Sequence, residues 1–219
     1  MRTAEGSVDL HSHLFMHEGM GVLMRGAFDD PARSMNWNTR LQTRISKENL
    51  EKSKLRIVVV SYYAHPILKL GNVRESILRQ IEMTENFVKE NPNWVIASSS
   101  SEARAALKVG KHVFVFSLET ARGTLDISED RKLFLDEKKI SIVTPFHLSP
   151  DRYGSPSLYY RVGIVNTPIE WFQSWSQDLV DRNGINVNPS GVWGEGRKLI
   201  AELVGRKVWI DFLHAFDRA

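Results

Sequence analysis

The sequence has no cysteine among its 219 residues. Disulfide bonds and thiolate metal sites are therefore excluded, and any metal ion must be held by histidine and carboxylate side chains. The sequence also has no run of about 18 apolar residues, which argues against a transmembrane helix, and no basic-then-apolar leader. A strand is predicted within ten residues of Met1, so the hypothesis that a leader has been removed stays open. The chain as given is expected in the cytoplasm, and a lost leader would make it secreted or membrane-anchored.

A strong excess of one charge is also missing. The net charge is +3, and lysines and arginines are scattered rather than gathered into a stripe. Nucleic acid is therefore not an expected partner. The composition, 42% hydrophobic and 25% charged, is typical of a globular protein with a sizeable core. There is no internal repeat, low-complexity tract or linker, so we expect a single domain over residues 1–219.

Four near-continuous apolar runs predict strands that are buried on both faces, which is typical of a parallel sheet. They span residues 55–63, 111–119, 140–147 and 207–214. Periodic apolar positions, caps and stops predict helices at 72–89, 101–109, 128–137, 169–181 and 190–203, and a minor strand is expected at 95–97. Asn72 is the expected cap of the first helix. Ser99 and Glu102 have the spacing of a capping box at the start of the second helix, and Gly110 is expected to end it. Strands that alternate with helices predict an α/β fold of parallel β/α units.

The stretch from Val8 to Leu14 predicts a further strand near the start of the chain. Apolar Val8, Leu10 and Leu14 alternate with polar residues, which predicts one buried face. His11 and His13 are two apart, so they project from the same face and could bind one metal ion. Taken alone, the pair is equally compatible with two ordinary histidines on a half-exposed strand.

Histidine and glutamate recur where the predicted strands end. Glu119, His147 and His214 each stand at the end of a different strand, as His11 and His13 do on the first. Parallel β/α proteins place their active sites at the carboxyl ends of the strands. Several imidazoles with one carboxylate suit zinc, and a central carboxylate can bridge two metal ions. The pattern predicts a metal site at this edge of the sheet.

Five segments together resemble one family. They are VDLHSHL, ASSSSEARAALKVGKHVFVFSLETARGTL, ISIVTPFHL, GINVNPSGVWGEGRKLIAEL and VWIDFLHAFD. Their order and spacing resemble the membrane-dipeptidase (renal dipeptidase-like, peptidase M19) family of the amidohydrolase superfamily. The resemblance implies a (β/α)8 TIM-barrel fold, and a metal-dependent hydrolase that cleaves dipeptides or related small amides with a metal-bound hydroxide.

The resemblance also implies roles for individual residues. His11 and His13 would bind the first metal ion, Glu119 would bridge two ions, and His214 would bind the second. His147 would hold or polarise the scissile carbonyl, so Glu119 and His147 are the catalytic candidates. Zinc, with two ions in the complete enzyme, is the implied cofactor, and a small peptide or amide is the implied partner.

Two residues after the predicted strand at 140–147 are further candidates for substrate binding. Arg152 could meet a substrate carboxylate through two hydrogen bonds, although an exposed arginine is the commoner case. Tyr153 begins an aromatic cluster over residues 153–175, which could line a substrate pocket or pack on itself.

The sequence departs from the family in three places. The family usually has His-x-Asp where this chain has His11-Ser12-His13, and Ala215-Phe216-Asp217 also differs. A (β/α)8 barrel needs about 250 residues, and we count five main strands before Ala219. We therefore expect a barrel with only about the first five β/α units, cut before a later histidine and aspartate.

Two other functions stay open on the sequence. A TatD-type nuclease or a PHP-type phosphoesterase begins with a similar strand, although a phosphodiester substrate favours a basic groove. An inactive, truncated remnant that acts as a binding module is the other alternative. A homodimer also stays open.

Overall fold

The computed structural model describes residues 6–15, 18–19, 52, 54–66, 69–147, 151–154, 180–182, 185–187 and 191–212. The chain divides into two compact units. Unit 1 comprises Met1–Ser117 with Glu137–Ser141, and unit 2 comprises Leu118–Asp136 with Ile142–Ala219. The single domain expected over residues 1–219 stays a prediction.

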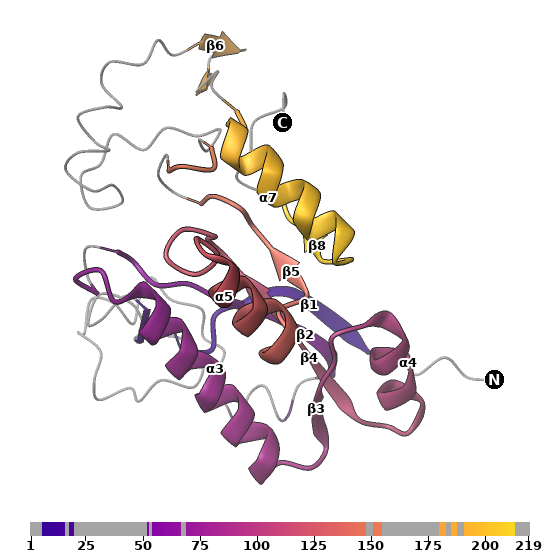
Figure 1. Cartoon of the computed structure of the whole chain (residues 1–219). Helices are drawn as coiled ribbons and strands as arrows, with labels where there is room; N and C mark the ends of the chain where they lie inside the picture. The colour runs from indigo at the N-terminus through magenta and orange to yellow at the C-terminus, as the bar shows by residue number, and fades with distance from the viewer. Residues whose placement is uncertain are drawn as a thin grey trace, which may run out of the picture. The chain divides into compact units, whose positions relative to one another are not determined.

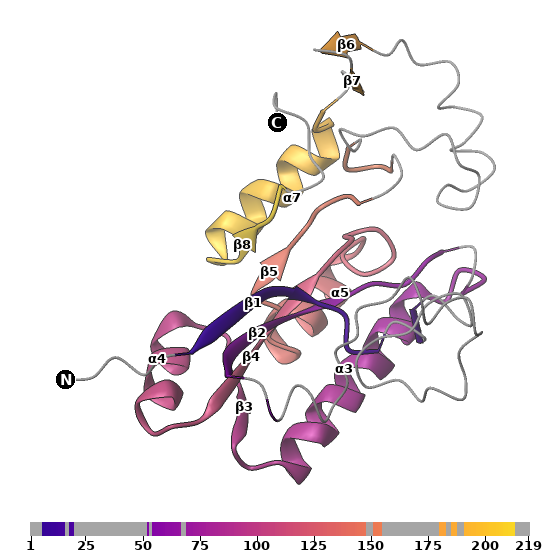
Figure 2. The same cartoon turned by 180° about the vertical axis from the view of Figure 1, so that it is seen from behind.

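Unit 1 is built on parallel strands (Figure 1). β1 (Ser7–Ser12) pairs in parallel with β2 (Leu55–Tyr62), and the two run side by side when seen from behind (Figure 2). β2 lies next to β4 (His112–Leu118), whose last residue belongs to unit 2. The short strand β3 (Trp94–Ile96) pairs in parallel with the first half of β4. It is the minor strand that the sequence predicts at 95–97.

Helix α3 (Val73–Glu90) connects β2 to β3 and covers the sheet with one apolar face. It begins after Asn72, where the sequence predicts the start, and it buries Val73, Ile77, Ile81 and Phe87. Three polar side chains on the same face are buried with them, and two of these bind the strand ends. Gln80 donates to the Tyr63 carbonyl at 2.9 Å, and the Tyr62 hydroxyl donates to Thr84 at 2.9 Å.

Helix α4 (Ser100–Lys108) is fixed by the cap that the sequence predicts. The Ser99 hydroxyl accepts a hydrogen bond from the Glu102 amide at 3.2 Å, and the Glu102 carboxylate accepts one from the Ser98 amide at 2.8 Å. This reciprocal arrangement satisfies amides that the first helical turn leaves open. The helix is followed by Gly110 at φ +83°, a conformation that favours glycine.

An aromatic cluster forms the core of unit 1 beside β3 and β4. The Phe114 ring stacks on Trp94 with centroids 4.4 Å apart, and Phe87 meets Phe114 edge-on at 5.8 Å. All three rings are buried. Tyr62 meets Phe116 edge-on at 5.2 Å, and burial raises the pKa of Tyr62 well above its ordinary value, so its hydroxyl stays neutral. This core therefore rests on apolar surface and uncharged hydrogen bonds.

β1 departs from the prediction in its burial. Leu14 is buried, but Val8 is 49% exposed and Leu10 is 75% exposed. The prediction of a buried face through Val8 and Leu10 is therefore wrong. Alternation decides which side of a strand a residue takes, but burial also needs an element packed on that side.

The described part of unit 2 has short strands, one short helix that continues into a π-helical turn, and one longer helix. The helix predicted at 128–137 forms as α5 (Ser128–Arg131) followed by a π-helical turn, η4 (Lys132–Glu137). β5 (Ile142–Val143) pairs in parallel with β8 (Trp209–Ile210), so both strands are shorter than predicted within the described residues. Between them, α7 (Gly194–Gly205) is the helix that the sequence predicts at 190–203.

A small hairpin in unit 2 was not predicted. β6 (Val180–Arg182) and β7 (Ile185–Val187) pair antiparallel. The helix predicted at 169–181 mostly lies outside the described residues, and its last two residues belong to β6, so the prediction is wrong there.

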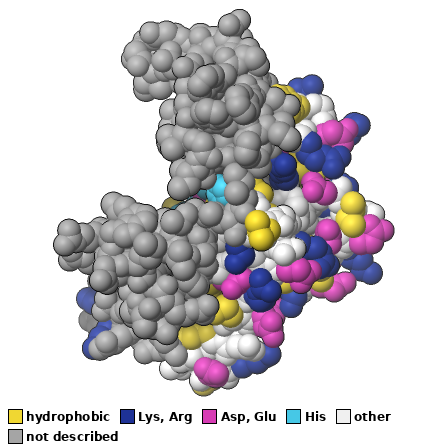
Figure 3. Space-filling view, turned by 90° about the vertical axis from the view of Figure 1, so that its left-hand side faces the viewer, with side chains coloured by type: hydrophobic (Ala, Val, Ile, Leu, Met, Phe, Trp, Pro, Cys, Tyr) yellow, Lys and Arg dark blue, Asp and Glu magenta, His cyan; other side chains and the backbone are white. Residues whose placement is uncertain are grey.

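The described parts confirm the predicted α/β class, with parallel strand pairs and with helices between β2 and β3, between β3 and β4, and between β4 and β5. On the face shown in Figure 3, the described lysines and arginines are interspersed with aspartates and glutamates. Many of these charges pair within a unit, as Arg79 does with Glu18 at 2.8 Å and Arg206 with Asp136 at 2.9 Å. Among the described residues, none of the helices is long and apolar enough to cross a membrane.

Candidate metal site

The two histidines at the end of β1 lie together in unit 1. The Nε2 atoms of His11 and His13 are 3.1 Å apart, and their rings stand nearly perpendicular, at 83°. The Asp9 carboxylate accepts a hydrogen bond from the His11 amide at 3.0 Å, which holds the strand just before the pair. The structure therefore brings the two imidazoles together as the alternation of the strand predicts.

Ser61, at the end of β2, contacts both imidazoles from the other side. Its carbonyl oxygen lies 2.8 Å from Nδ1 of His13, and its hydroxyl lies 3.2 Å from Nδ1 of His11. A carbonyl oxygen only accepts hydrogen bonds, so the hydrogen of neutral His13 is on Nδ1. The Nε2 lone pair of His13 is then directed toward His11.

The spacing of the pair fits a metal ion. Zinc–nitrogen bonds of about 2.0–2.1 Å at a tetrahedral angle put two ligand nitrogens roughly 3.3 Å apart. The observed Nε2–Nε2 distance of 3.1 Å is close to that value. Metal-binding histidines commonly donate their second ring N–H to a carbonyl or similar oxygen, as His13 does here. The residues present in unit 1 therefore fit two of the ligands of a divalent ion.

Glu119 and His147 lie together in unit 2. Glu119 directly follows β4, and His147 comes four residues after β5. Backbone hydrogen bonds hold their segments side by side, because the Thr144 amide donates to the Leu118 carbonyl at 2.8 Å and the Ala121 amide donates to the Pro145 carbonyl at 3.1 Å. The carboxylate and the imidazole are thereby aligned by the backbone of both strand ends.

The contact between these two side chains is direct and buried. Nε2 of His147 lies 3.1 Å from Oε1 of Glu119, and the side chains are 11% and 3% exposed. Since a carboxylate oxygen accepts, Nε2 of His147 donates its hydrogen to it. The imidazole can therefore hold a proton at Nε2 beside a negative charge.

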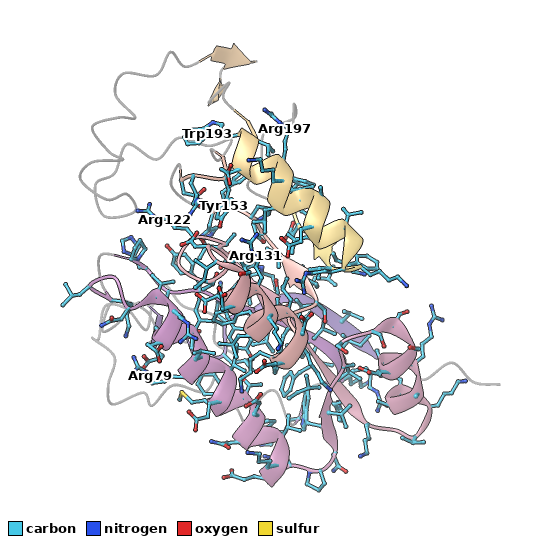
Figure 4. All side chains as sticks on the ribbon, viewed as in Figure 1. Arg79, Arg122, Arg131, Tyr153, Trp193 and Arg197 are labelled. Carbon is cyan, nitrogen blue, oxygen red and sulfur yellow. The ribbon has the colours of Figure 1, made fainter. Side chains whose placement is uncertain are left out.

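The two candidates for substrate binding occupy different environments in unit 2. Tyr153 is buried, and its hydroxyl donates to the Asp126 carboxylate at 2.8 Å and to the Leu125 carbonyl at 3.2 Å. Arg152 is about half exposed and lies 3.8 Å from Asp126 and 3.9 Å from Glu195. Tyr153 and Trp193 both lie near the start of α7 (Figure 4). Substrate binding by these residues stays a prediction.

A buried carboxyl group stands next to them. Asp151 accepts hydrogen bonds from the amides of Tyr153 at 2.8 Å and Gly154 at 3.3 Å. Burial raises the pKa of Asp151 to about 7, against the opposing effect of these amides and of Arg122. The turn at 151–154 thus depends on a carboxyl group that titrates near neutral pH.

Sequence reasoning missed Ser61 and could not follow His214. Ser61 carries a hydroxyl group and directly follows the apolar run 57–60 of its strand, near the strand end, and that position was the available signal. His214 lies outside the described residues, so its role as a second metal ligand stays a prediction.

No family model matches the sequence, and no curated protein matches it. Among solved structures, the chain is similar to a dipeptidase described as a metallopeptidase of family M19, with 12% identity, a TM-score of 0.62, and coverage of 97% of this chain and 57% of that one. The probable dipeptidase PvdM from Pseudomonas aeruginosa gives 15% identity, a TM-score of 0.62, and coverage of 98% and 48%.

A metallopeptidase from Rhodobacter sphaeroides, bound to a phosphinate mimic of the dipeptide L-Ala-D-Ala, is similar as well. It gives 12% identity, a TM-score of 0.61, and coverage of 97% of this chain and 59% of that one. The chain thus spans about half the length of these relatives. The likeness is one of fold, and it confirms the predicted partial TIM barrel.

Proposed function

We propose that this chain carries the metal-binding part of a metal-dependent hydrolase that cleaves dipeptides or related small amides. The observation that carries the proposal is the His11–His13 pair, with Nε2 atoms 3.1 Å apart at the end of the first strand of a dipeptidase-like fold. The dipeptidase names of the structural relatives support the choice of substrate class.

His11, His13 and Glu119 would hold a divalent ion, with zinc as the proposed metal. Glu119 would bridge to a second ion that His214 binds. The position of Glu119 in the chain supports this role. It is the first residue after β4, and β4 belongs to the same sheet as β1. When bound, the metal would supply Lewis acidity and an activated water.

The protein's own side chains would handle the substrate. His147 would direct its Nε2–H, which now meets Glu119, toward the oxygen of the scissile carbonyl. Arg152 would contact the substrate carboxylate, because its guanidinium is about half exposed and carries the geometry that carboxylates favour. Tyr153 would form part of the pocket wall. Arg152 lies over this wall, because its guanidinium carbon is 5.6 Å from the centroid of the Tyr153 ring.

The proposal is tested by metal titration and by a dipeptide assay on the same preparation. We expect binding of zinc, and hydrolysis of a panel of dipeptides that zinc restores after chelation. His13→Ala and Glu119→Gln are expected to weaken zinc binding at least tenfold. His112→Gln is the control, because His112 stands at the other end of β4 and bonds the Leu55 carbonyl at 2.6 Å.

Two results would contradict the proposal in different ways. If His13→Ala binds zinc as tightly as the wild type, the proposed metal site is contradicted. If the wild type binds zinc but cleaves no dipeptide, the metal site is supported and the proposed hydrolysis is contradicted. The hypothesis of an inactive, truncated remnant predicts this second result.

A further inference from the structure

Arg152, the proposed contact of the substrate carboxylate, lies between two carboxyl groups of unit 2. Its Nη1 atom is 3.8 Å from Oδ1 of Asp126, and its Nη2 atom is 3.9 Å from Oε2 of Glu195. Both distances exceed hydrogen-bond range, so neither carboxylate takes up the N–H groups of the guanidinium. The two acidic groups carry the same charge at nearly the same distance, but they are held in different ways.

Asp126 is held through both of its carboxylate oxygens. The Gly123 amide donates to Oδ2 at 2.8 Å, and the Tyr153 hydroxyl donates to Oδ1 at 2.8 Å. Burial and the hydrogen bond to Asp126 raise the pKa of Tyr153 above its ordinary value of 10.0, so the hydroxyl keeps its hydrogen. The carboxylate that faces Arg152 therefore has a defined position.

The Tyr153 ring supports the guanidinium from a second direction. The guanidinium carbon of Arg152 lies 5.6 Å from the ring centroid, within the range of a cation–π contact. Tyr153 is buried, and its carbonyl accepts a hydrogen bond from the Trp193 amide at 3.0 Å, next to the start of α7 (Figure 4). The ring is thus anchored at its hydroxyl and at its backbone.

Glu195 is held more loosely on the other side of Arg152. It stands in the first turn of α7, and its side chain is about half exposed. Its Oε1 atom accepts a hydrogen bond at 2.8 Å from Lys198, which is largely exposed. An exposed ion pair of this kind restrains a side chain weakly, because water competes for both partners. Glu195 therefore places a charge beside Arg152 with little positional restraint.

We infer that Asp126 is a positioning residue, which holds the Arg152 guanidinium on the Tyr153 ring in the orientation that binds a free carboxylate of the substrate. The inference rests on the proposed function, because it takes Arg152 as the group that binds this carboxylate. Ordering a long side chain before the ligand arrives avoids an entropic cost at the moment of binding. The substrate class that follows is a peptide with a free C-terminal carboxylate, rather than the corresponding amide.

The experiment follows the Nε–H signal of Arg152 by nitrogen-15 NMR while N-acetylglycine is added to the metal-free protein at low ionic strength. N-acetylglycinamide, which lacks the carboxylate, is the control ligand, and Arg152→Lys assigns the signal by its absence. In the wild type we expect N-acetylglycine to shift the signal until it saturates, and the amide to leave it in place. A signal that N-acetylglycine does not move overturns the inference.

Two variants separate position from charge. Asp126→Asn keeps the volume and one acceptor oxygen but removes the charge, and Glu195→Gln removes the same charge on the other side. If charge alone mattered, both variants would bind N-acetylglycine more tightly. A positioning role predicts opposite effects. Binding should be about fivefold weaker in Asp126→Asn, which matches the cost of ordering one long side chain, and about twofold tighter in Glu195→Gln. Tighter or unchanged binding in Asp126→Asn, or an equal loss in both variants, overturns the inference.

Where Asp126→Asn folds poorly, Tyr153→Phe tests the same role. It keeps the ring and both charges, and it removes only the hydroxyl that donates to Asp126. Binding of N-acetylglycine should weaken about twofold or more, and unchanged binding overturns the inference. Glu202→Gln is the matched control, because Glu202 lies further along α7 and pairs with Arg131 and Arg206. It should bind N-acetylglycine as the wild type does, and a loss equal to that in Asp126→Asn overturns the inference.

None of these measurements requires zinc or hydrolysis, so the inference and the proposed function can fail separately. A wild type that binds N-acetylglycine at Arg152 but cleaves no dipeptide contradicts only the hydrolysis. A wild type that cleaves dipeptides, while Asp126→Asn binds N-acetylglycine as tightly as the wild type, contradicts only the positioning role of Asp126.

Discussion

The two units of the chain are stabilised by different kinds of interaction. Unit 1 rests on regular strands, a long helix and an aromatic cluster, and the polar side chains that α3 buries are uncharged. Unit 2 also buries apolar side chains, among them Phe134, Phe146 and Leu203, but carboxyl groups fix its turns in addition. Asp126 holds Tyr153, and Asp151 holds the turn at 151–154. The stabilisation that comes from apolar burial hardly depends on pH, whereas the contribution of a buried carboxyl group changes as the group titrates. The stability of the two units should therefore respond differently to the same change.

The largest effect is expected in the aromatic cluster of unit 1. Phe114→Ala should lower the free energy of unfolding by about 3–5 kcal/mol, because it removes a fully buried ring that stacks on Trp94. The measurement is urea unfolding followed by circular dichroism. Leu10→Ala is the comparison on β1, where the side chain is 75% exposed, and it should cost no more than about 0.5 kcal/mol. Equal losses in the two variants would contradict the burial described for β1.

The next effect belongs to unit 2 and depends on pH. The folded pKa of Asp151 is about 7, above its ordinary value of 3.8, so the folded state binds the proton more tightly. Stability from this group is therefore present at pH 4 and is lost as the pH rises toward 7. At about 1.4 kcal/mol per pKa unit, the loss is on the order of a few kcal/mol.

Asp151→Asn isolates this contribution. Asparagine keeps an oxygen that accepts from the Tyr153 and Gly154 amides, but it does not titrate. The charged groups that act on Asp151 are Arg122 and Asp126, and both remain in the variant. The difference in unfolding free energy between variant and wild type should grow from pH 4 to pH 7. A difference that stays constant over this range would show that Asp151 is not the titrating group.

What the sequence predicted well is local. The Ser99 cap, the Gly110 terminator and the start of α3 after Asn72 each depend on a few neighbouring residues, and the structure contains all three. The pairing of His11 with His13 is equally local, because it follows from the alternation of one strand. Such features require no knowledge of which elements meet.

What the sequence did not predict depends on distant contacts. Val8 and Leu10 alternate as buried residues do, but their burial requires a covering element. Ser61 contacts the histidines only because β2 pairs with β1, about 50 residues earlier in the chain. The β6–β7 hairpin is an exception, since the Asn183-Gly184 dipeptide in the sequence between the two strands is a turn signal that was available.

A third comparison tests the close packing of the turns in unit 2. A Cβ at Gly196, in the first turn of α7, would collide with the carbonyl oxygen of Tyr153, whereas a Cβ at Gly205 would meet nothing within 4 Å. Gly196→Ala should therefore cost about 1–3 kcal/mol, because backbone atoms must move apart. Gly205→Ala should cost nothing, or raise stability slightly through the unfolded state. The stability of both variants is measured by thermal unfolding. An equal loss of stability in the two would contradict the close contact between the first turn of α7 and the Tyr153 carbonyl.

The smallest effect concerns a carboxyl group of unit 1 whose pKa moves in the opposite direction from that of Asp151. Hydrogen bonds from the amide and hydroxyl of Ser98 lower the pKa of Glu102 below its ordinary value of 4.5. Stability from this group is therefore present above pH 4.5 and is lost as the pH falls through the folded pKa. Glu102 is exposed, so solvent screening keeps the contribution well under 1 kcal/mol.

Glu102→Gln keeps an acceptor for the cap and removes the titration, so it tests the sign directly. Its stability relative to the wild type should be lowest near neutral pH and should recover below about pH 4. Asp151→Asn is expected to show the reverse, with its relative stability highest near neutral pH. Measuring both variants over one pH series decides whether the two units differ in kind, because a common acid effect on the whole chain would move both curves in the same direction.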